Sequence, residues 1–202
     1  MPQRRTTVER LETFSDSVFA VMVAIMVLNL KLPEHPTFAA LLPLWPAALG
    51  YAVSYQFMAV VWMNHHHLLR SADEPTPRLI WIHFAFLFMV SLVPFSTAWV
   101  ASTHLAAIPV FVYAAVLILV ESVYLLFEHQ ASAQTVVEEV SHQTRRLPKL
   151  RFLLAFGPYV AAMLVSLKFP WWGFASICCI LLYLRPRLIR TRRSGAGQLQ
   201  KA

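Results

Sequence analysis

Charge and cysteine are both scarce in this chain, and each scarcity narrows the class of protein. Charged residues make up 13 % of the 202 residues and hydrophobic residues 58 %, whereas soluble proteins have about 25 % charged residues. The two cysteines, Cys178 and Cys179, are adjacent, so they do not form an ordinary disulfide, and no CxxC spacing is present. We therefore exclude a soluble globular domain and interpret the cysteines as packing residues.

Apolar residues occur instead in long blocks, which is typical of a polytopic membrane protein. A spanning helix needs roughly 17–25 apolar residues, and six blocks come close to this length, although the last two are short. The predicted spans are 11–32, 45–69, 79–102, 106–128, 151–168 and 171–185. Because no internal repeat is evident, we predict one all-α domain with six transmembrane helices over residues 1–193 and a disordered tail over 194–202.

Prolines and one acidic residue refine this prediction. Pro94, Pro109 and Pro158 lie within predicted spans and indicate local kinks that neighbouring helices must repair. The first apolar block contains Asp16 in place of a small-residue cleavage site, so we predict no cleavable signal peptide.

Basic residues are distributed unequally between the two sides of the predicted bundle. The N-terminus, the 70–78 loop, the 129–151 segment and the C-terminal tail carry 15 of the 17 lysines and arginines, and the other side carries Lys31 and Lys168. By the positive-inside rule, both termini should face the cytoplasm. The net charge of +7 therefore fits membrane topology and anionic headgroups, and not a nucleic-acid-binding domain.

A set of polar residues should lie at one depth near the cytoplasmic side. Asp16 lies about five residues into the first span, and the other members lie a similar distance from the basic ends of the second and third spans. At about 1.5 Å of rise per residue, all fall within roughly 10 Å of one interface. The set consists of Ser15, Asp16, Asn64, His65, His66, His67, Trp81 and His83. We predict that donors from the second and third helices hold the Asp16 carboxylate, as intramembrane polar groups require.

Three interpretations of this polar set compete. A metal site is disfavoured because His65, His66 and His67 point about 100° apart on a helix, and no spaced histidine boxes occur elsewhere. A proton relay through Asp16 and the histidines is chemically possible. The interpretation we favour is an interhelical lock that fixes the first helix.

The opposite face of the first span carries an apolar stripe. At 100° per residue, the stripe residues fall within an arc of about 80°, and Asp16 lies about 140° from Val21. The stripe consists of Ser17, Val21, Ile25, Leu28 and Leu32. Such a stripe fits lipid contact or helix packing as well as a pore gated by an apolar constriction, so the pattern alone leaves the choice open.

Three motifs resemble those of one known family. The segment "RLETFSD" fits the signature R-x-x-x-F-S-D through Arg10, Phe14, Ser15 and Asp16. The segment "VWMNHHHLLR" resembles the family's second-helix motif around W-x-N-H-H, and "LIWIHFAFLFMVSLVPFSTAWV" resembles its third helix. Because the motifs occur in the right order, the first half of the chain is identified as similar to the prokaryotic TMEM175 potassium channels.

This resemblance implies a homotetramer of six-helix subunits whose first helices line a central pore, without the TVGYG carbonyl filter of ordinary potassium channels. It implies a constriction made by apolar residues of the first helix, which by offset from the aspartate of the signature are Val21, Ile25 and Leu28. The other pore-lining residues would be Ser17, Ala24 and Leu32. The signature and the polar lock would comprise Arg10, Phe14, Ser15, Asp16, Asn64, His65, His66, Trp81 and His83.

Two positions depart from the family's usual pattern. Ala24 stands where members often have a threonine linked to potassium preference, which predicts modest selectivity. His83 stands where the third helix usually has asparagine. Imidazole can donate to Asp16 and can also titrate, so we hypothesise that His83 makes the Asp16 network more sensitive to acid.

The function expected from these observations is a potassium-permeable cation leak channel in a bacterial or archaeal plasma membrane. We expect no enzyme activity, no cofactor and no bound metal. The expected partners are other copies of the chain, the lipid bilayer, and potassium and other monovalent cations. One alternative is a proton-coupled secondary transporter that uses Asp16 and the histidines, although internal repeats and broken helices are not evident. Another is a membrane enzyme with a histidine-bound metal.

Overall fold

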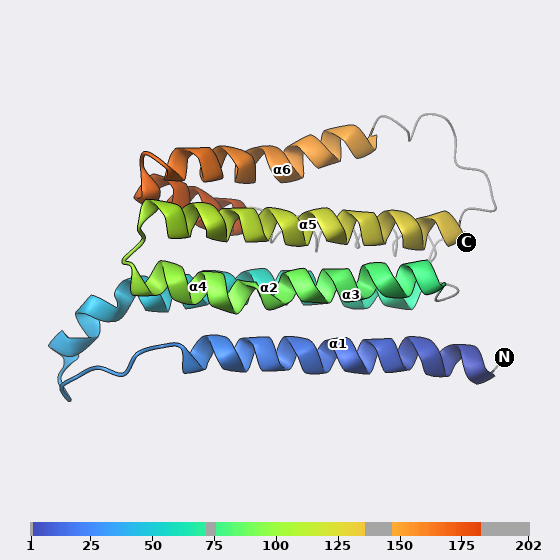
Figure 1. Cartoon of the computed structure of the whole chain (residues 1–202), viewed down its shortest axis with the longest axis horizontal. Coiled ribbons are helices and arrows are strands. Elements are labelled where there is room, and N and C mark those ends of the chain that lie inside the picture. Colours follow the sequence, from blue (N-terminus) through green and yellow to red (C-terminus); the bar gives the residue numbers. More distant parts are fainter. Residues whose placement is uncertain (1, 72–75, 136–146, 183–202) are drawn as a thin grey trace, which may run out of the picture.

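The computed structural model describes residues 2–71, 76–135 and 147–182, and its regular elements are all helices (Figure 1). In chain order they are α1 (Pro2–Leu28), η1 (Phe38–Leu44), α2 (Trp45–Ser71), α3 (Pro77–Ser91), α4 (Val93–Ser102), α5 (Ala107–Thr135) and α6 (Leu147–Ser166), followed by an apolar helix over Pro170–Leu182. The segments long and apolar enough to cross a membrane are Thr7–Leu28, Phe38–Leu69, Pro77–Ser102 and Ala107–Ala131. Shorter apolar helices follow over Phe156–Ser166 and Pro170–Leu182. The prediction of an all-helical membrane protein with six helical segments is confirmed, whereas its tetrameric assembly stays a prediction.

The helices stack in layers, with α5 between α6 and the layer formed by α2, α3 and α4 (Figure 1). Buried side chains of α5 supply much of the core. They include Val110, Tyr113, Ala114, Val116, Leu117 and Val120. α1 lies at the edge of the bundle against α2, α3 and α4, and of its described hydrophobic side chains it buries Phe19 and Met26. Most of the apolar surface of α1 is therefore not covered by the rest of the described chain.

The third apolar segment is broken between α3 and α4. Pro94 lies in the first turn of α4, where it has no backbone N–H to continue the hydrogen bonds of α3. The hydroxyls of Ser96 and Thr97 donate to the Val93 carbonyl at 3.0 and 2.8 Å, which satisfies a backbone acceptor beside the break. The sequence predicts a kink at Pro94, and the break between α3 and α4 agrees with that prediction. Pro109 instead lies in the first turn of α5, where proline is tolerated, so the kink predicted there is not needed.

α1 ends at Leu28, four residues before the predicted end of the first span. Backbone N–H groups of Asn29 and Leu30 donate to carbonyls of the last turn, both at 3.1 Å. The chain then leaves the helix, so Leu32 does not lie on the helical wheel of α1. The predicted place of Leu32 on the stripe is therefore wrong.

One end of the bundle gathers the segments that the charge pattern assigns to one side. The N-terminus, the end of α2, the start of α3, the end of α5 and the start of α6 lie at this end (Figure 1). This arrangement agrees with a common side for these segments, while the cytoplasmic identity of that side stays a prediction. Residues 136–146 and 183–202, which hold much of the predicted cytoplasmic loop and the whole predicted tail, lie outside the described residues.

Candidate functional site

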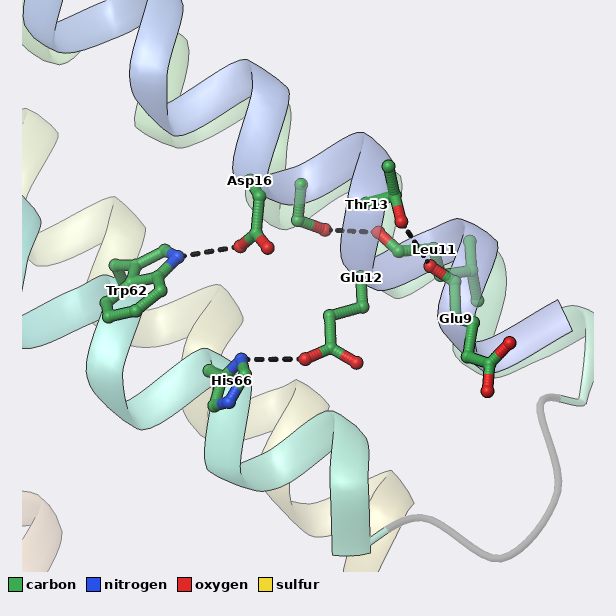
Figure 2. Close-up of polar contacts among 8 residues, drawn as sticks. Glu9, Leu11, Glu12, Thr13, Asp16, Trp62 and His66 are labelled. Carbon is green, nitrogen blue, oxygen red and sulfur yellow. Dashed lines mark hydrogen bonds and ion pairs between the residues drawn. The ribbon is translucent and has the colours of Figure 1, made fainter. Parts of the chain in front are cut away.

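α1 is tied to α2 by two polar contacts along one seam (Figure 2). The indole Nε1–H of Trp62 donates to Asp16 Oδ1 at 2.7 Å, and His66 Nδ1 lies 2.8 Å from Glu12 Oε1. The two residues that each helix contributes are four positions apart, so they lie on one face of that helix. The second helix thus supplies the donor that holds the Asp16 carboxylate, and it does so through an indole.

A buried polar chain links α2, α3 and α1. His65 Nε2 and His83 Nδ1 are 3.1 Å apart, and His83 Nε2 lies 3.1 Å from Ser15 Oγ. These three residues are each 1 % exposed. The rings of Phe86 and Phe127 stack on His65 at centroid distances of 5.1 and 5.7 Å. The polar chain therefore lies in surroundings made largely of aromatic carbon, where an unpaired polar group is costly.

The Leu11 carbonyl fixes the direction of these hydrogen bonds. Ser15 Oγ donates its single hydrogen to this carbonyl at 2.7 Å, so it can only accept from His83. A neutral His83 that donates through Nε2 has an unprotonated Nδ1, and this nitrogen accepts from His65 Nε2. The donors therefore follow one another from α2 to α3 to α1, and the chain is satisfied with both rings neutral.

Two aromatic residues of the predicted set take different positions. Phe14 packs edge-on against Phe84 of α3, with ring centroids 5.6 Å apart. Trp81 precedes His83 by two residues, which turns it to nearly the opposite side of α3. It is 76 % exposed, so its predicted place in the polar lock is wrong.

The contact predicted between His83 and Asp16 is also wrong. The Nε2–H of His83 is used by Ser15, while Asp16 accepts from α2. Titration of His83 would therefore have to act through Ser15, and not on the Asp16 carboxylate directly. Within the described part of the chain, the hydrogen bonds that join α1 to its neighbours do not include Arg10, which is exposed, or Asn64, which is half-buried.

Replacing Trp62 with phenylalanine should lower the free energy of unfolding by about 1–2 kcal/mol, because the Asp16 carboxylate loses its donor within an apolar segment. The unfolding midpoint in detergent, followed by circular dichroism, measures this loss. The matched control is Trp81→Phe, which removes an exposed indole and should change the midpoint little. Equal losses in the two variants would show that the contact with Asp16 does not stabilise the helix pair.

The opposite face of α1 is left uncovered by the rest of the described chain. Val21, Ile25 and Leu28 are 53 %, 40 % and 81 % exposed. Ser17 and Ala24 are exposed as well, and Ser17 Oγ donates to a carbonyl of its own helix at 2.9 Å. α1 therefore uses one side for polar contacts within its own subunit and presents an open apolar stripe on another side.

A further polar contact, which no pattern in the sequence predicts, joins α2, α4 and α5. Ser54 Oγ lies 2.7 Å from Thr97 Oγ1 and 2.9 Å from the Tyr113 hydroxyl, and all three residues are buried. Hydroxyl groups that hydrogen-bond across helices are common in membrane bundles. In the sequence, each of these residues is recognisable only as a hydroxyl group within an apolar block. The sequence does not show which of these hydroxyl groups are in contact.

The three consecutive histidines do not converge on one point. His65 is buried among aromatic rings, His66 faces Glu12, and His67 is exposed. Across residues 2–71, 76–135 and 147–182, no group of three or more His, Cys, Asp or Glu side chains is placed to hold a metal ion. The geometry therefore gives no support to the histidine-bound metal interpretation.

Comparison with known proteins agrees with this arrangement of motifs and helices. A family model described as "Endosomal/lysosomal potassium channel TMEM175" matches residues 10–94, which include the R-x-x-x-F-S-D segment of α1. The crystal structure of a lysosomal potassium-selective channel TMEM175 homolog from Chamaesiphon minutus matches with a TM-score of 0.77 and 26 % sequence identity, over 90 % of this chain and 98 % of that chain. The chain is similar to the TMEM175 family in its first half and to a TMEM175 homolog over most of its length. The resemblance inferred from the motifs is thus confirmed.

Proteins named potassium channel are also similar to this chain in sequence. A potassium channel from Chryseobacterium sp. (strain P1-3) is 38 % identical over 120 residues, which are 59 % of this chain and 62 % of that protein. A potassium channel from Chamaesiphon minutus (strain ATCC 27169 / PCC 6605) is 28 % identical over 184 residues, which are 85 % of this chain and 90 % of that protein. The chain thus spans less than two thirds of the Chryseobacterium relative. The matching family model and these relatives are described as potassium channels, which bears out the prediction that this chain is not an enzyme.

Proposed function

We propose that the chain forms a potassium-permeable cation channel of the leak type, with a modest preference for potassium over sodium. The matching family model and the relatives named potassium channel support potassium as the permeant ion. The sequence has no TVGYG stretch, so a carbonyl filter would not provide the selectivity. The assembly we propose is a homotetramer in a bacterial or archaeal plasma membrane. The excess of lysine and arginine on one side favours cytoplasmic termini.

The observation that carries this proposal is the uncovered apolar stripe of α1. Val21, Ile25 and Leu28 are exposed on a helix whose other side is held by polar contacts. Closed rotational symmetry of four copies would bring four such stripes face to face around an axis. Narrow apolar rings exclude water and block ions, whereas wider rings become wet and conduct. The pore would also be lined by Ser17 and Ala24.

The polar contacts would set the balance between the narrow and the wide pore. A tilt or rotation of α1 that separates the apolar rings must either carry α2 and α3 along or stretch their hydrogen bonds to Asp16 and Ser15. These bonds therefore couple the position of the pore-lining stripe to the rest of the subunit. In this proposal the lock has a mechanical role in gating, beyond its contribution to stability.

The alternative of a proton-coupled transporter has weaker support. A relay from Asp16 through the histidines needs a continuous hydrogen-bonded path between them. In the described residues, the histidine pair leads to Ser15 and the Leu11 carbonyl, while Asp16 is bound separately by Trp62. The two polar systems are thus distinct contacts and not one relay.

Potassium efflux from proteoliposomes at equal internal and external pH tests the proposal. We expect efflux from liposomes that contain the wild-type protein, and several-fold faster efflux for Leu28→Ala, because a smaller side chain widens the apolar ring. The matched control is Leu164→Ala, which shortens an exposed leucine of α6 and should leave the rate unchanged. Efflux that occurs only under a pH gradient would overturn the channel proposal in favour of a transporter.

A further inference from the structure

A groove runs between α1 and α2 beside the polar seam, and its volume is about 710 Å³. Asp16 and Trp62 line one end of the groove, and Val23 and Tyr55 line it farther along the two helices. Seven residues of helix separate the two levels on each side, so the groove extends over roughly 10 Å along the helix axes.

Small side chains leave this groove open. Ala20 of α1 and Ala59 of α2 line it between its ends, and both are exposed. Phe19 and Met58, which are buried, form its apolar floor. A volume within about 300–1,000 Å³, an apolar wall and a single charged group are typical of small-molecule sites. Because the groove lies on membrane-spanning segments, a ligand would reach it from the lipid phase.

The Asp16 carboxylate at the end of the groove lacks a cation in the described part of the chain. Its one hydrogen bond there comes from the neutral indole of Trp62, and the nearby side chain of His66 lies against Glu12 and not against Asp16. A carboxylate can accept about four hydrogen bonds. A charged group at this depth is stabilised when it is paired. The indole contact also fixes the carboxylate in place, which lowers the entropic cost of binding a cation to it.

We propose that this groove binds a lipophilic ammonium ion, with the ammonium group on the Asp16 carboxylate and the single apolar tail along the groove between Ala20 and Ala59. The negative charge of the Asp16 carboxylate favours an ammonium ion over the other possible occupants of the groove. A phospholipid would bring an anionic phosphate to the carboxylate. A second copy of the chain is the competing occupant, but the exposed stripe of its α1 is uncharged and faces the pore axis in the proposed tetramer, so it offers Asp16 no cation. Binding of such an ion in this groove is a property separate from ion conduction.

Photo-crosslinking of the full-length protein in phosphatidylcholine nanodiscs tests this site. The probe is a decylammonium ion that carries a diazirine on its tail, and mass spectrometry locates the label. We expect the label on residues 19–23 of α1 and 55–62 of α2. Excess decylammonium should abolish the labelling, whereas decanol and decanoate at the same concentration should compete at least several-fold more weakly.

Two variants separate the charge of the site from its shape. Asp16→Asn removes the charge and should remove the advantage of decylammonium over decanol. Ala59→Trp fills the groove and should abolish the labelling, while Ala85→Trp, at an exposed alanine of α3, should not change it. Labelling outside the groove, equal competition by decanol, or labelling that survives Ala59→Trp would overturn the proposal. So would an absence of label, which is the result expected if a second copy covers the groove.

Discussion

Attaching a positive charge at position 25 should lower the potassium current at least about tenfold, since a rise of only 1.4 kcal/mol in the barrier has this effect. The experiment uses Ile25→Cys in a protein whose Cys178 and Cys179 are replaced with alanine, treated with a cationic thiosulfonate during a bilayer recording. If four copies of α1 line the pore, the reagent places charge in its narrowest, apolar part, where ions are least solvated. Val21→Cys and Leu28→Cys should respond in the same direction.

The matched control for this experiment is Val27→Cys. Val27 belongs to the same helix and is exposed to a similar extent, 46 % against 40 % for Ile25, but it lies about 160° away around the helix. Modification at position 27 should leave most of the current. Block at Val27→Cys together with an unaffected Ile25→Cys would place the ion path on another face of α1.

The second large effect concerns His83. Replacing it with leucine should lower the free energy of unfolding by about 2–5 kcal/mol, because His65 and Ser15 each lose a buried partner. The two hydrogen bonds are 3.1 Å long, and the three residues are almost completely buried. The midpoint of unfolding in mixed detergent micelles measures the loss.

Two other variants serve as comparisons for the His83→Leu result. His83→Asn keeps a donor and an acceptor at the position, so it should lose less stability than His83→Leu. His129→Leu removes an exposed histidine of α5 and should change the free energy by no more than about 0.5 kcal/mol. A His83→Leu protein as stable as the wild type would mean that the polar chain contributes nothing to holding α1.

The number of helices followed from the sequence, but the end of α1 did not. Hydropathy counts apolar residues, and the apolar block continues past Leu28 to Leu30 and Leu32. It does not record that Pro33 disfavours a helical conformation for the residue before it. The chain leaves the helix at Asn29, and a residue counted as pore-lining lies in the connection.

The depth of the polar residues could be predicted, whereas their partners could not. Rise per residue places side chains at one level, but a contact also needs the right direction around each helix. Trp81 and His83 share a level and point to nearly opposite sides, so only one of them meets α1. The donor to Asp16 could not be chosen from spacing, because it depends on which face α2 turns to α1.

The groove and the buried hydroxyl contact depend on pairs that are distant in the sequence. Ala20 and Ala59 are ordinary residues of two apolar blocks, and only the packing of α1 against α2 makes them the walls of one space. Ser54, Thr97 and Tyr113 come from three helices in the same way. The residue pattern within one apolar block predicts a helix and its exposed face. Contacts between two helices can be identified only from the three-dimensional structure.

The most direct test of the proposed channel is a planar bilayer recording of the purified protein with potassium on one side and sodium on the other. We expect a current whose reversal potential is displaced toward the potassium equilibrium potential, and a larger current for Leu28→Ala, whose apolar ring is wider. That result would place a potassium-preferring constriction on α1. Silent bilayers with both proteins, from preparations that still move potassium in liposomes under a pH gradient, would contradict it.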